Sequence, residues 1–193
     1  MSPVLSATAT AALERAHHRA EAVLQTLSTV ADSLEQGRRI EISLLKEGVV
    51  FLQTFADQCQ MAEEDALLFP TLEAKCSPSD ASLIENLRND HQNLAALTSE
   101  LSKATDEYAV AGDPAKEHLA RTLQRLVALC REHIRSEDHI VLPLAEKILP
   151  PEELNALFQA FQKIESQMNL DESAERINLH TQRCACHMGE VFI

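Results

Sequence analysis

Two segments of the chain share a pattern of acidic and apolar residues that suits metal binding. Residues 133–143 read His-Ile-Arg-Ser-Glu-Asp-His-Ile-Val-Leu-Pro, and residues 60–70 read Gln-Met-Ala-Glu-Glu-Asp-Ala-Leu-Leu-Phe-Pro. Each contains Glu-Asp, then apolar residues, then Pro, at matching offsets. His133 and Glu137 are four residues apart, so on a helix they lie one turn apart on the same face. An imidazole and a carboxylate in this geometry are ligands with which helical bundles hold iron or manganese.

The two copies differ at their first position. Where the later copy has His133, the earlier copy has Gln60, while Glu64 corresponds to Glu137. The chain therefore carries one complete imidazole–carboxylate pair and one pair in which an amide replaces the imidazole. The pattern is compatible with an intact metal site, a modified site or a relic.

The composition predicts helices around a sizeable core. A chain of 193 residues suits one domain with a modest extension, or at most two small domains. Only 4 Gly, no Trp and 1 Tyr favour helices over sheet, and 45% hydrophobic residues supply a core. The net charge of -13 argues against binding to nucleic acid and to anionic membranes.

The sequence also predicts a cytoplasmic protein. Its first residues have neither the basic region nor the long apolar run of a signal peptide. No segment reaches the roughly 18 uninterrupted apolar residues of a membrane span. The five cysteines are odd in number and scattered, which fits a reducing compartment better than a disulfide framework.

Glycine and proline divide the chain into helical segments. Four long segments with helical periodicity precede a shorter one, with approximate ranges 6–35, 39–75, 79–110, 114–148 and 151–168. We expect an all-α fold: an antiparallel up-and-down four-helix bundle over residues 1–148, with an additional C-terminal helix and tail over 149–193 packed on or beside it. Pro70 and Pro143 are expected to kink or end their helices.

The apolar stripe of each long segment is interrupted by polar residues at one level. In chain order these residues are His17, Gln60, Glu64, His91, His133 and Glu137. The stripes are expected to continue through Leu67 on the second segment and Ile140 on the fourth. The equivalent histidines of the first and third segments are 74 residues apart and the equivalent glutamates are 73 apart, so the two halves look like copies of one helical hairpin.

Several other residues with metal-binding chemistry fall off these stripes. His18, His118 and His139 are expected to be solvated surface residues. Cys59 and Cys130 are expected to be small buried residues.

The polar layer favours a metal cluster. A buried carboxylate costs several kcal/mol unless it is paired or bound to a metal. The stripes carry two glutamates and three histidines but no lysine or arginine that would neutralise them. A lone core histidine is more often hydrogen-bonded than metal-bound, but polar groups at one level on four helices reverse that expectation. Two carboxylates with terminal imidazoles suit a pair of iron ions.

These features resemble the hemerythrin-like, or HHE cation-binding, domain family. The family pattern places His on the first and third helices and His-x-x-x-Glu on the second and fourth, and the resemblance covers about residues 8–148. The stretches that look like its second- and fourth-helix signatures are Phe55-Ala-Asp-Gln-Cys59, Glu64-Asp-Ala-Leu-Leu-Phe-Pro70 and His133-Ile-Arg-Ser-Glu137.

The resemblance implies a di-iron centre with named ligands. One iron would be held by His91 and His133, and the other by His17 together with the position of Gln60. Glu64 and Glu137 would bridge the two ions. The family also commonly has a second histidine at the position of Met61, which this chain lacks.

Gln60 leaves three alternatives for the second metal position. The iron there is under-coordinated, with positions that water or O₂ fills. A nearby carboxylate replaces the lost imidazole, with Glu21 favoured over Glu63 because residues 17 and 21 stack on one helix face, while residue 63 is rotated from 64 by about 100°. Or the position is empty, which leaves a mononuclear or unmetallated bundle.

The C-terminal tail contains a second cluster of metal-binding residue types. His180, Cys184, Cys186 and His187 lie within eight residues and would suffice as four ligands for zinc, or the cysteines would be redox-active. The competing interpretation is a flexible tail whose cysteines are incidental.

Three functions follow from these predictions. The resemblance implies a non-haem iron protein that binds O₂, NO or peroxide in storage, sensing or a stress response. The alternatives are a regulatory bundle that has lost its metal and binds a protein partner or a second copy of itself, and an iron sensor or donor. Nothing in the sequence identifies a substrate pocket beyond the metal ligands, so the sequence leaves catalysis open.

Overall fold

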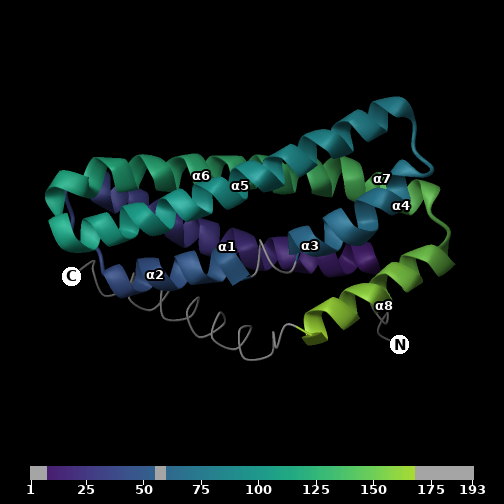
Figure 1. Ribbon diagram of the computed structural model, residues 1–193, viewed down its shortest axis with the longest axis horizontal. Coiled ribbons are helices and arrows are strands. Elements are labelled where there is room, and N and C mark those ends of the chain that lie inside the picture. Colours follow the sequence, from purple (N-terminus) through teal and green to yellow (C-terminus); the bar gives the residue numbers. More distant parts are fainter. Residues whose placement is uncertain (1–7, 55–59, 168–193) are drawn as a thin grey trace, which may run out of the picture.

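Every regular element in the described part of the chain is a helix. The computed structural model describes residues 8–54 and 60–167, and no strand occurs among them (Figure 1). The predicted all-α class is therefore confirmed for these residues.

The first half of the fold contains one continuous helix and one helical stretch made of several pieces. Helix α1 (Ala9–Glu35) begins at Thr8, whose side chain accepts a hydrogen bond from the backbone N–H of Ala11 at 3.2 Å. Gly37 has a φ of 72° in the turn that follows, a conformation that favours glycine. The second stretch consists of α2 (Ile42–Phe51), α3 (Met61–Glu63), the π-helical turn η2 (Glu64–Leu68) and α4 (Phe69–Glu73).

The second half repeats this organisation and adds a final helix. Its elements are α5 (Pro78–Ala111), the 3₁₀ turn η3 (Asp113–Ala115), α6 (Lys116–Ser136), the π-helical turn η4 (Glu137–Val141), α7 (Leu142–Ile148) and α8 (Pro151–Gln167). The π-helical turns η2 and η4 begin at Glu64 and Glu137, the equivalent glutamates of the two sequence copies. The internal likeness of the sequence therefore extends to an unusual local structure.

The helices of the two halves close around a shared core. Helix α1 contacts α2 and α6, and α5 likewise contacts α2 and α6, so these four helices form a ring. Figure 1 shows α5 and α6 running alongside one another. Helix α8 contacts α1 and η2. The up-and-down order of the four long stretches stays a prediction.

Two apolar clusters fill the interior, one on each side of a polar layer. Along α1, Leu13 belongs to the first cluster and Leu24 to the second, with His17 between them. His91 separates the same two clusters along α5. The first cluster includes three side chains of α8, namely Leu154, Leu157 and Phe161. Apolar side chains therefore lie on both sides of the polar layer, and α8 contributes to the first of these two clusters.

The π-helical turns shift the register of the residues that follow them. The backbone N–H of Leu142 bonds to the carbonyl of Glu137, five residues earlier, instead of the usual four. As a result Val141 and Leu142 are buried, while Ile140 is 47% exposed. The expectation that Ile140 continues the inward stripe is wrong, because it assumed a uniform period of 3.6 residues.

The first copy shows the same shift. Phe69 donates its backbone N–H to the carbonyl of Glu64, again five residues earlier. Leu68 and Phe69 are buried. Leu67 is partly buried and packs against the first apolar cluster, so it still contacts the core although the fully buried positions shift by one residue.

Neither Pro70 nor Pro143 ends its helix. Each occupies the first turn of the helical segment after a π-helical turn, in α4 and α7 respectively. Proline is tolerated at such a position because its missing N–H and its fixed φ suit the first turn of a helix. The wide turn directly before each proline is where the helix accommodates the ring.

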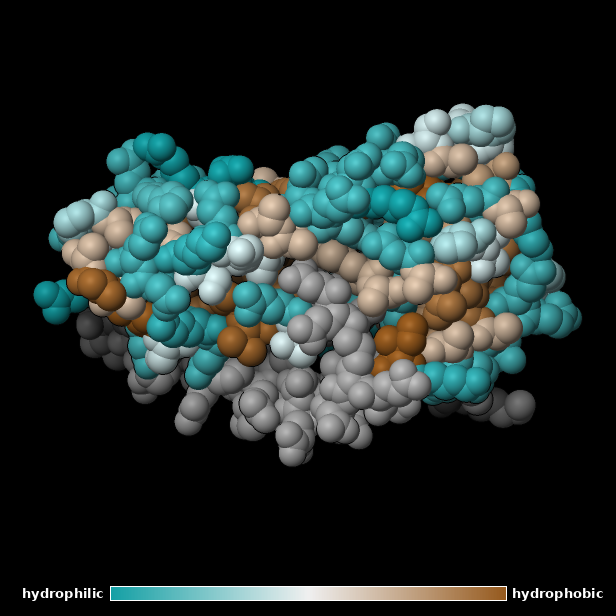
Figure 2. Space-filling view, in the orientation of Figure 1, coloured by the Kyte–Doolittle hydropathy of each residue, from teal (hydrophilic) through white to brown (hydrophobic). Residues whose placement is uncertain are grey.

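Hydrophilic side chains cover most of the face shown in Figure 2, in keeping with the net charge of -13. Among the described residues, no helix combines the length and the apolar character that a membrane span requires.

Candidate metal centre

Six polar side chains meet in the layer between the two apolar clusters. They come from α1, from the start of α3, from α5 and α6, and from the two π-helical turns, and they are His17, Gln60, Glu64, His91, His133 and Glu137. Each is between 1% and 8% exposed. The structure therefore brings together the whole set that the sequence placed at one level, from all four long helical stretches.

Four of these side chains surround one point. Ligand atoms of Glu64, His91, His133 and Glu137 all lie within 4.8 Å of one another. The set offers two imidazole nitrogens and two carboxylate oxygens, which is a donor set that suits a divalent first-row metal ion. We call these four residues the four-ligand group.

Contacts within the layer pair each half of the chain with the other. His17 Nε2 lies 3.1 Å from Glu137 Oε2, and His91 Nε2 lies 3.3 Å from Glu64 Oε2. The first contact joins α1 to η4, and the second joins α5 to η2. Each half therefore supplies an imidazole to the glutamate of the opposite half.

The two halves differ at the remaining contact of each glutamate. His133 Nε2 lies 3.3 Å from Glu137 Oε1, whereas Gln60 Nε2 donates a hydrogen bond to Glu64 Oε1 at 3.1 Å. An amide nitrogen is a donor without a lone pair for a metal ion, so in this orientation Gln60 acts as a hydrogen-bond donor and not as a ligand.

Two aspartates outside the layer lie beside the outer nitrogens of two histidine rings, and one of these contacts, between Asp138 and His17, is a hydrogen bond. Asp138 Oδ1 lies 2.6 Å from Nδ1 of His17, and Asp65 Oδ2 lies 3.0 Å from Nδ1 of His91. Such carboxylates fix the tautomer and orientation of a metal-binding imidazole. Both aspartates belong to the repeated Glu-Asp pairs of the sequence, but the pairs alone indicated no role for them. The matching offset was the available signal.

An aromatic ring and an arginine further restrain His91. The ring of Phe69 stacks on that of His91 with centroids 5.6 Å apart and an interplanar angle of 18°. Arg88 lies over Phe69 at 5.3 Å and donates to Asp65 Oδ1 at 3.2 Å. These contacts hold both the ring and its aspartate in place. The sequence did not indicate this role of Arg88, because Arg88 lies on α5, outside the repeated motif.

Several inner polar atoms of the layer lack aligned hydrogen-bond partners among the described residues, although His91 Nε2 and His133 Nε2 lie within hydrogen-bonding distance of each other at 3.2 Å. The atoms that lack such partners include His17 Nε2, Glu64 Oε2 and both carboxylate oxygens of Glu137. The contacts of 3.1–3.3 Å place these atoms close together, but their angles do not satisfy a hydrogen bond. Buried polar groups in native proteins are normally satisfied. Lone pairs that converge without pairing are the arrangement expected of ligands for a shared cation.

Without a metal, protons are drawn to this cluster. Burial disfavours the charged form of His17, but the close approach and negative charge of Glu137 outweigh it and raise the pKa of His17 to about 9. Burial likewise opposes charge on His91, and the contact and charge of Glu64 raise the pKa of His91 to about 9. Cations are therefore favoured beside the two glutamates.

The other members of the layer titrate in opposite directions. Burial lowers the pKa of His133 to about 4, and it raises the pKa of Glu137, with help from the charge of Glu64, to about 8. Burial opposes ionisation of Glu64, but the contact and charge of His91 lower the pKa of Glu64 overall. A metal ion that binds here competes with protons, so its binding depends on pH.

The two candidate replacement ligands are placed very differently. Glu21 accepts hydrogen bonds from Arg131, at 2.7 Å from Nη2 and 3.0 Å from Nε, and its side chain is about half exposed at 47%. Glu21 was the favoured candidate in one of the three alternatives, and its contact with Arg131, which neutralises and holds this carboxylate, argues against that role. Glu63 is buried at 4% exposure but is not part of the four-ligand group.

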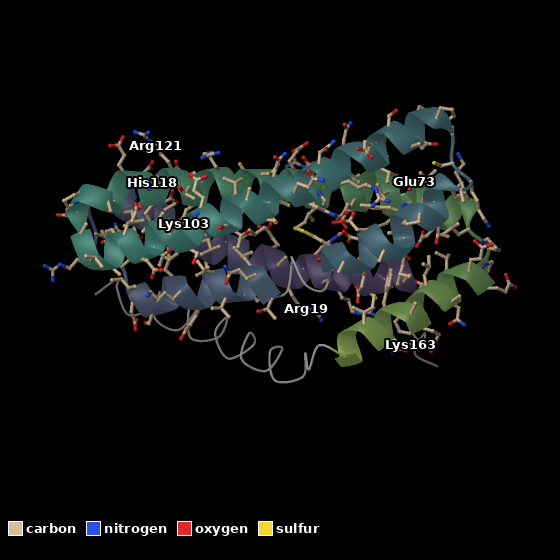
Figure 3. All side chains as sticks on the ribbon, in the orientation of Figure 1. Arg19, Glu73, Lys103, His118, Arg121 and Lys163 are labelled. Atoms are coloured by element: carbon tan, nitrogen blue, oxygen red, sulfur yellow. The ribbon has the colours of Figure 1, made fainter. Side chains whose placement is uncertain are left out.

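The remaining sequence predictions divide between described and undescribed residues. His18, His118 and His139 are exposed as expected, and Figure 3 shows His118 near one end of α6. Cys130 is buried at 6% exposure, as expected. The proposed tail site at His180, Cys184, Cys186 and His187 lies outside the described residues, and so do residues 55–59 with Cys59.

The fold and the layer define a class: helical bundles with a buried histidine–carboxylate group suited to a cation. Residues 8–145 match the hemerythrin HHE cation-binding domain, which is more than half of the chain. The protein therefore belongs to the hemerythrin HHE cation-binding family.

Individual curated proteins also match part of the chain, but their names indicate no function. Uncharacterized proteins of Mycobacterium tuberculosis and Mycobacterium bovis are 25% identical over 118 residues, which cover 61% of this chain and 46% of each relative. The chain thus spans about half the length of the curated relatives that it matches. No solved structure matches the chain.

Proposed function

We propose that this protein is a non-haem iron protein that binds O₂, NO or peroxide at the polar layer, in storage, sensing or a stress response. The carboxylates of Glu64 and Glu137 would be shared between two metal positions. His91 and His133 would complete one position, and His17 would serve the other. In keeping with the scattered cysteines, the proposed site of action is the cytoplasm.

One observation carries this proposal. Buried lone pairs of His17, Glu64 and Glu137 converge without satisfying one another, and the ligand atoms of the four-ligand group lie within 4.8 Å of one another. Imidazole and carboxylate together suit iron, manganese or zinc better than calcium or magnesium, which prefer oxygen alone. Membership of a cation-binding family supports the same conclusion.

The residues of the chain would prepare this site in three ways. Asp65 and Asp138 orient the histidine rings through their outer nitrogens. The apolar clusters on both sides exclude water, which strengthens the attraction between the carboxylates and a cation. Bound iron would supply electron exchange and a coordination site for a small ligand.

Metal analysis of the purified full-length protein tests the proposal. Protein from iron-replete cells is expected to contain iron and to show near-ultraviolet and visible absorption that changes on addition of NO to the reduced form. His91→Ala is expected to lose the iron, while the matched surface change His18→Ala is expected to retain it.

Two outcomes would contradict this assignment. The first is wild-type protein with no bound metal and no thermal shift on anaerobic addition of Fe(II). The second is equal iron content in the His91→Ala and His18→Ala variants.

A further inference from the structure

We propose that the two metal positions are unequal, because Gln60 leaves only one of them with a full ligand set. The four-ligand group would hold one ion tightly. The second position, at His17 and the outer sides of the two glutamates, would take an ion weakly and release it. This inference rests on the proposed function, and it specifies how many metal ions the polar layer retains.

The first step is the completeness of the four-ligand group. Its two imidazoles and two carboxylates come from α5, α6 and the two π-helical turns, and all four side chains are at most 5% exposed. Two histidines with carboxylate ligands suffice to hold a non-haem Fe(II) ion. Nothing further from the chain is needed to fill this position.

The second step is an internal comparison that the fold makes possible. Gln60 lies four residues before Glu64, as His133 lies four residues before Glu137. Each of the two side chains contacts one oxygen of its glutamate. The imidazole has a lone pair to offer a cation. The amide nitrogen instead donates a proton to Glu64, and it occupies an oxygen that an ion in the second position would use.

The orientation of the Gln60 amide follows from its surroundings. Its partner is a buried carboxylate, which accepts hydrogen bonds and repels a carbonyl oxygen. Turning the amide oxygen inward to coordinate a metal would therefore break the hydrogen bond to Glu64. This competition weakens the second position further.

The third step concerns the two candidate carboxylates, Glu21 and Glu63, neither of which belongs to the four-ligand group. Glu21 is engaged by Arg131. Glu63 precedes Glu64 on one helix and is turned from it by about 100° around the axis. His17 then remains as the one imidazole for the second position among the described residues, held between Glu137 and Asp138.

Metal retention separates the two positions directly. Full-length protein is loaded with excess Fe(II) without oxygen, passed over a gel-filtration column in the presence of a weak chelator, and analysed for iron per chain. Wild type is expected to retain one ion, and Gln60→His is expected to retain two. Gln60→Ala is the matched control, because it removes the amide without adding an imidazole, and it is expected to retain one.

A second pair of variants tests the inference without depending on the folding of Gln60→His. His17→Ala is expected to keep the retained ion, because His17 lies outside the four-ligand group. His133→Ala is expected to lose it. Electron paramagnetic resonance of the oxidised wild type should show an isolated high-spin ferric ion, whereas the oxidised Gln60→His protein should show a loss of signal from coupling between two ions.

The outcomes distinguish the inference from the proposed function. No retained iron in wild type overturns both. Two retained ions in wild type overturn the inference alone, and a drop to one ion in Glu63→Gln would then identify Glu63 as the replacement ligand. One ion in wild type with no gain in a folded Gln60→His protein also overturns it, because position 60 would not face the second metal.

Discussion

At the scale of single residues, the ligands are held by neighbours that do not themselves face the metal position. Besides its contact with Glu64 inside the layer, the His91 ring is restrained by Asp65 at its outer nitrogen and by the face of Phe69. Arg88 links two of these supports by contacting both the aspartate and the aromatic ring. An imidazole restrained in this way loses little conformational freedom when it binds a metal.

Removing the aspartate charge should therefore weaken metal binding without unfolding the bundle. Asp65→Asn is expected to lower the affinity for Fe(II) by about 10- to 100-fold, the usual effect of removing a partner of a metal-binding histidine. Competition with a chromogenic chelator measures this change. Asp106→Asn is the control, because Asp106 pairs with Lys46 on the surface. Equal affinities in the two variants would show that Asp65 does not support the ligand.

The sequence predicted the residues of the layer better than it predicted their supports. His17, His91, His133 and Glu137 stood out because a polar residue on an apolar stripe is a local signal that needs no knowledge of the fold. Arg131 and Arg88 gave no such signal, since each meets its partner across a gap in sequence of 110 and 23 residues respectively. Glu21 became a candidate ligand for the same reason, because its partner Arg131 is far away in the sequence.

At the scale of elements, the two π-helical turns decide which side chains enter the core after each glutamate. A turn of this kind adds one residue to a helix and rotates everything beyond it. Helical segments and their approximate ends were predictable from periodicity, because most of the chain obeys one period. The turns were not, because their sequences contain apolar residues on both of the competing faces.

Mutations can test the shift in helical register that follows Glu137. Leu142→Ala is expected to lower the free energy of unfolding by about 2–5 kcal/mol, because this side chain is 2% exposed in the core. Ile140→Ala is expected to change it by no more than about 0.5 kcal/mol, as is usual for exposed positions. Urea denaturation of both variants gives the comparison. The reverse order would mean that the helix keeps a uniform period through Glu137.

At the scale of the whole molecule, the metal-free protein should lose stability as the solution becomes alkaline. The pKa of His17 and that of His91 rise from an ordinary 6.5 to about 9 in the fold, and that of Glu137 rises to about 8. Each raised value means that the folded state binds the proton more tightly than the unfolded state does. Their stabilising contribution is complete only below the unfolded values and disappears as the pH passes the folded ones.

Between pH 6.5 and 8 all three groups act in the same direction, and between pH 8 and 9 the two histidines still do. The free energy of unfolding of the metal-free protein should therefore fall from pH 6.5 to 9. Urea denaturation at a series of pH values measures the decline. Protein loaded with Fe(II) should show a weaker dependence, because metal ligands are already deprotonated. A stability that rises over the same interval in the metal-free protein would contradict the proton-binding role of the layer.

The crossing of contacts between the two halves has a consequence for how such a site can change. His17 meets the glutamate of the second half, and His91 meets the glutamate of the first. If the same layer were assembled from two identical hairpins, any substitution at one imidazole would appear twice and alter both halves of the layer together. Because the two halves are joined in one chain, each half of the layer can change its sequence independently. Only then can one keep its histidine at 133 while the other carries the amide of Gln60.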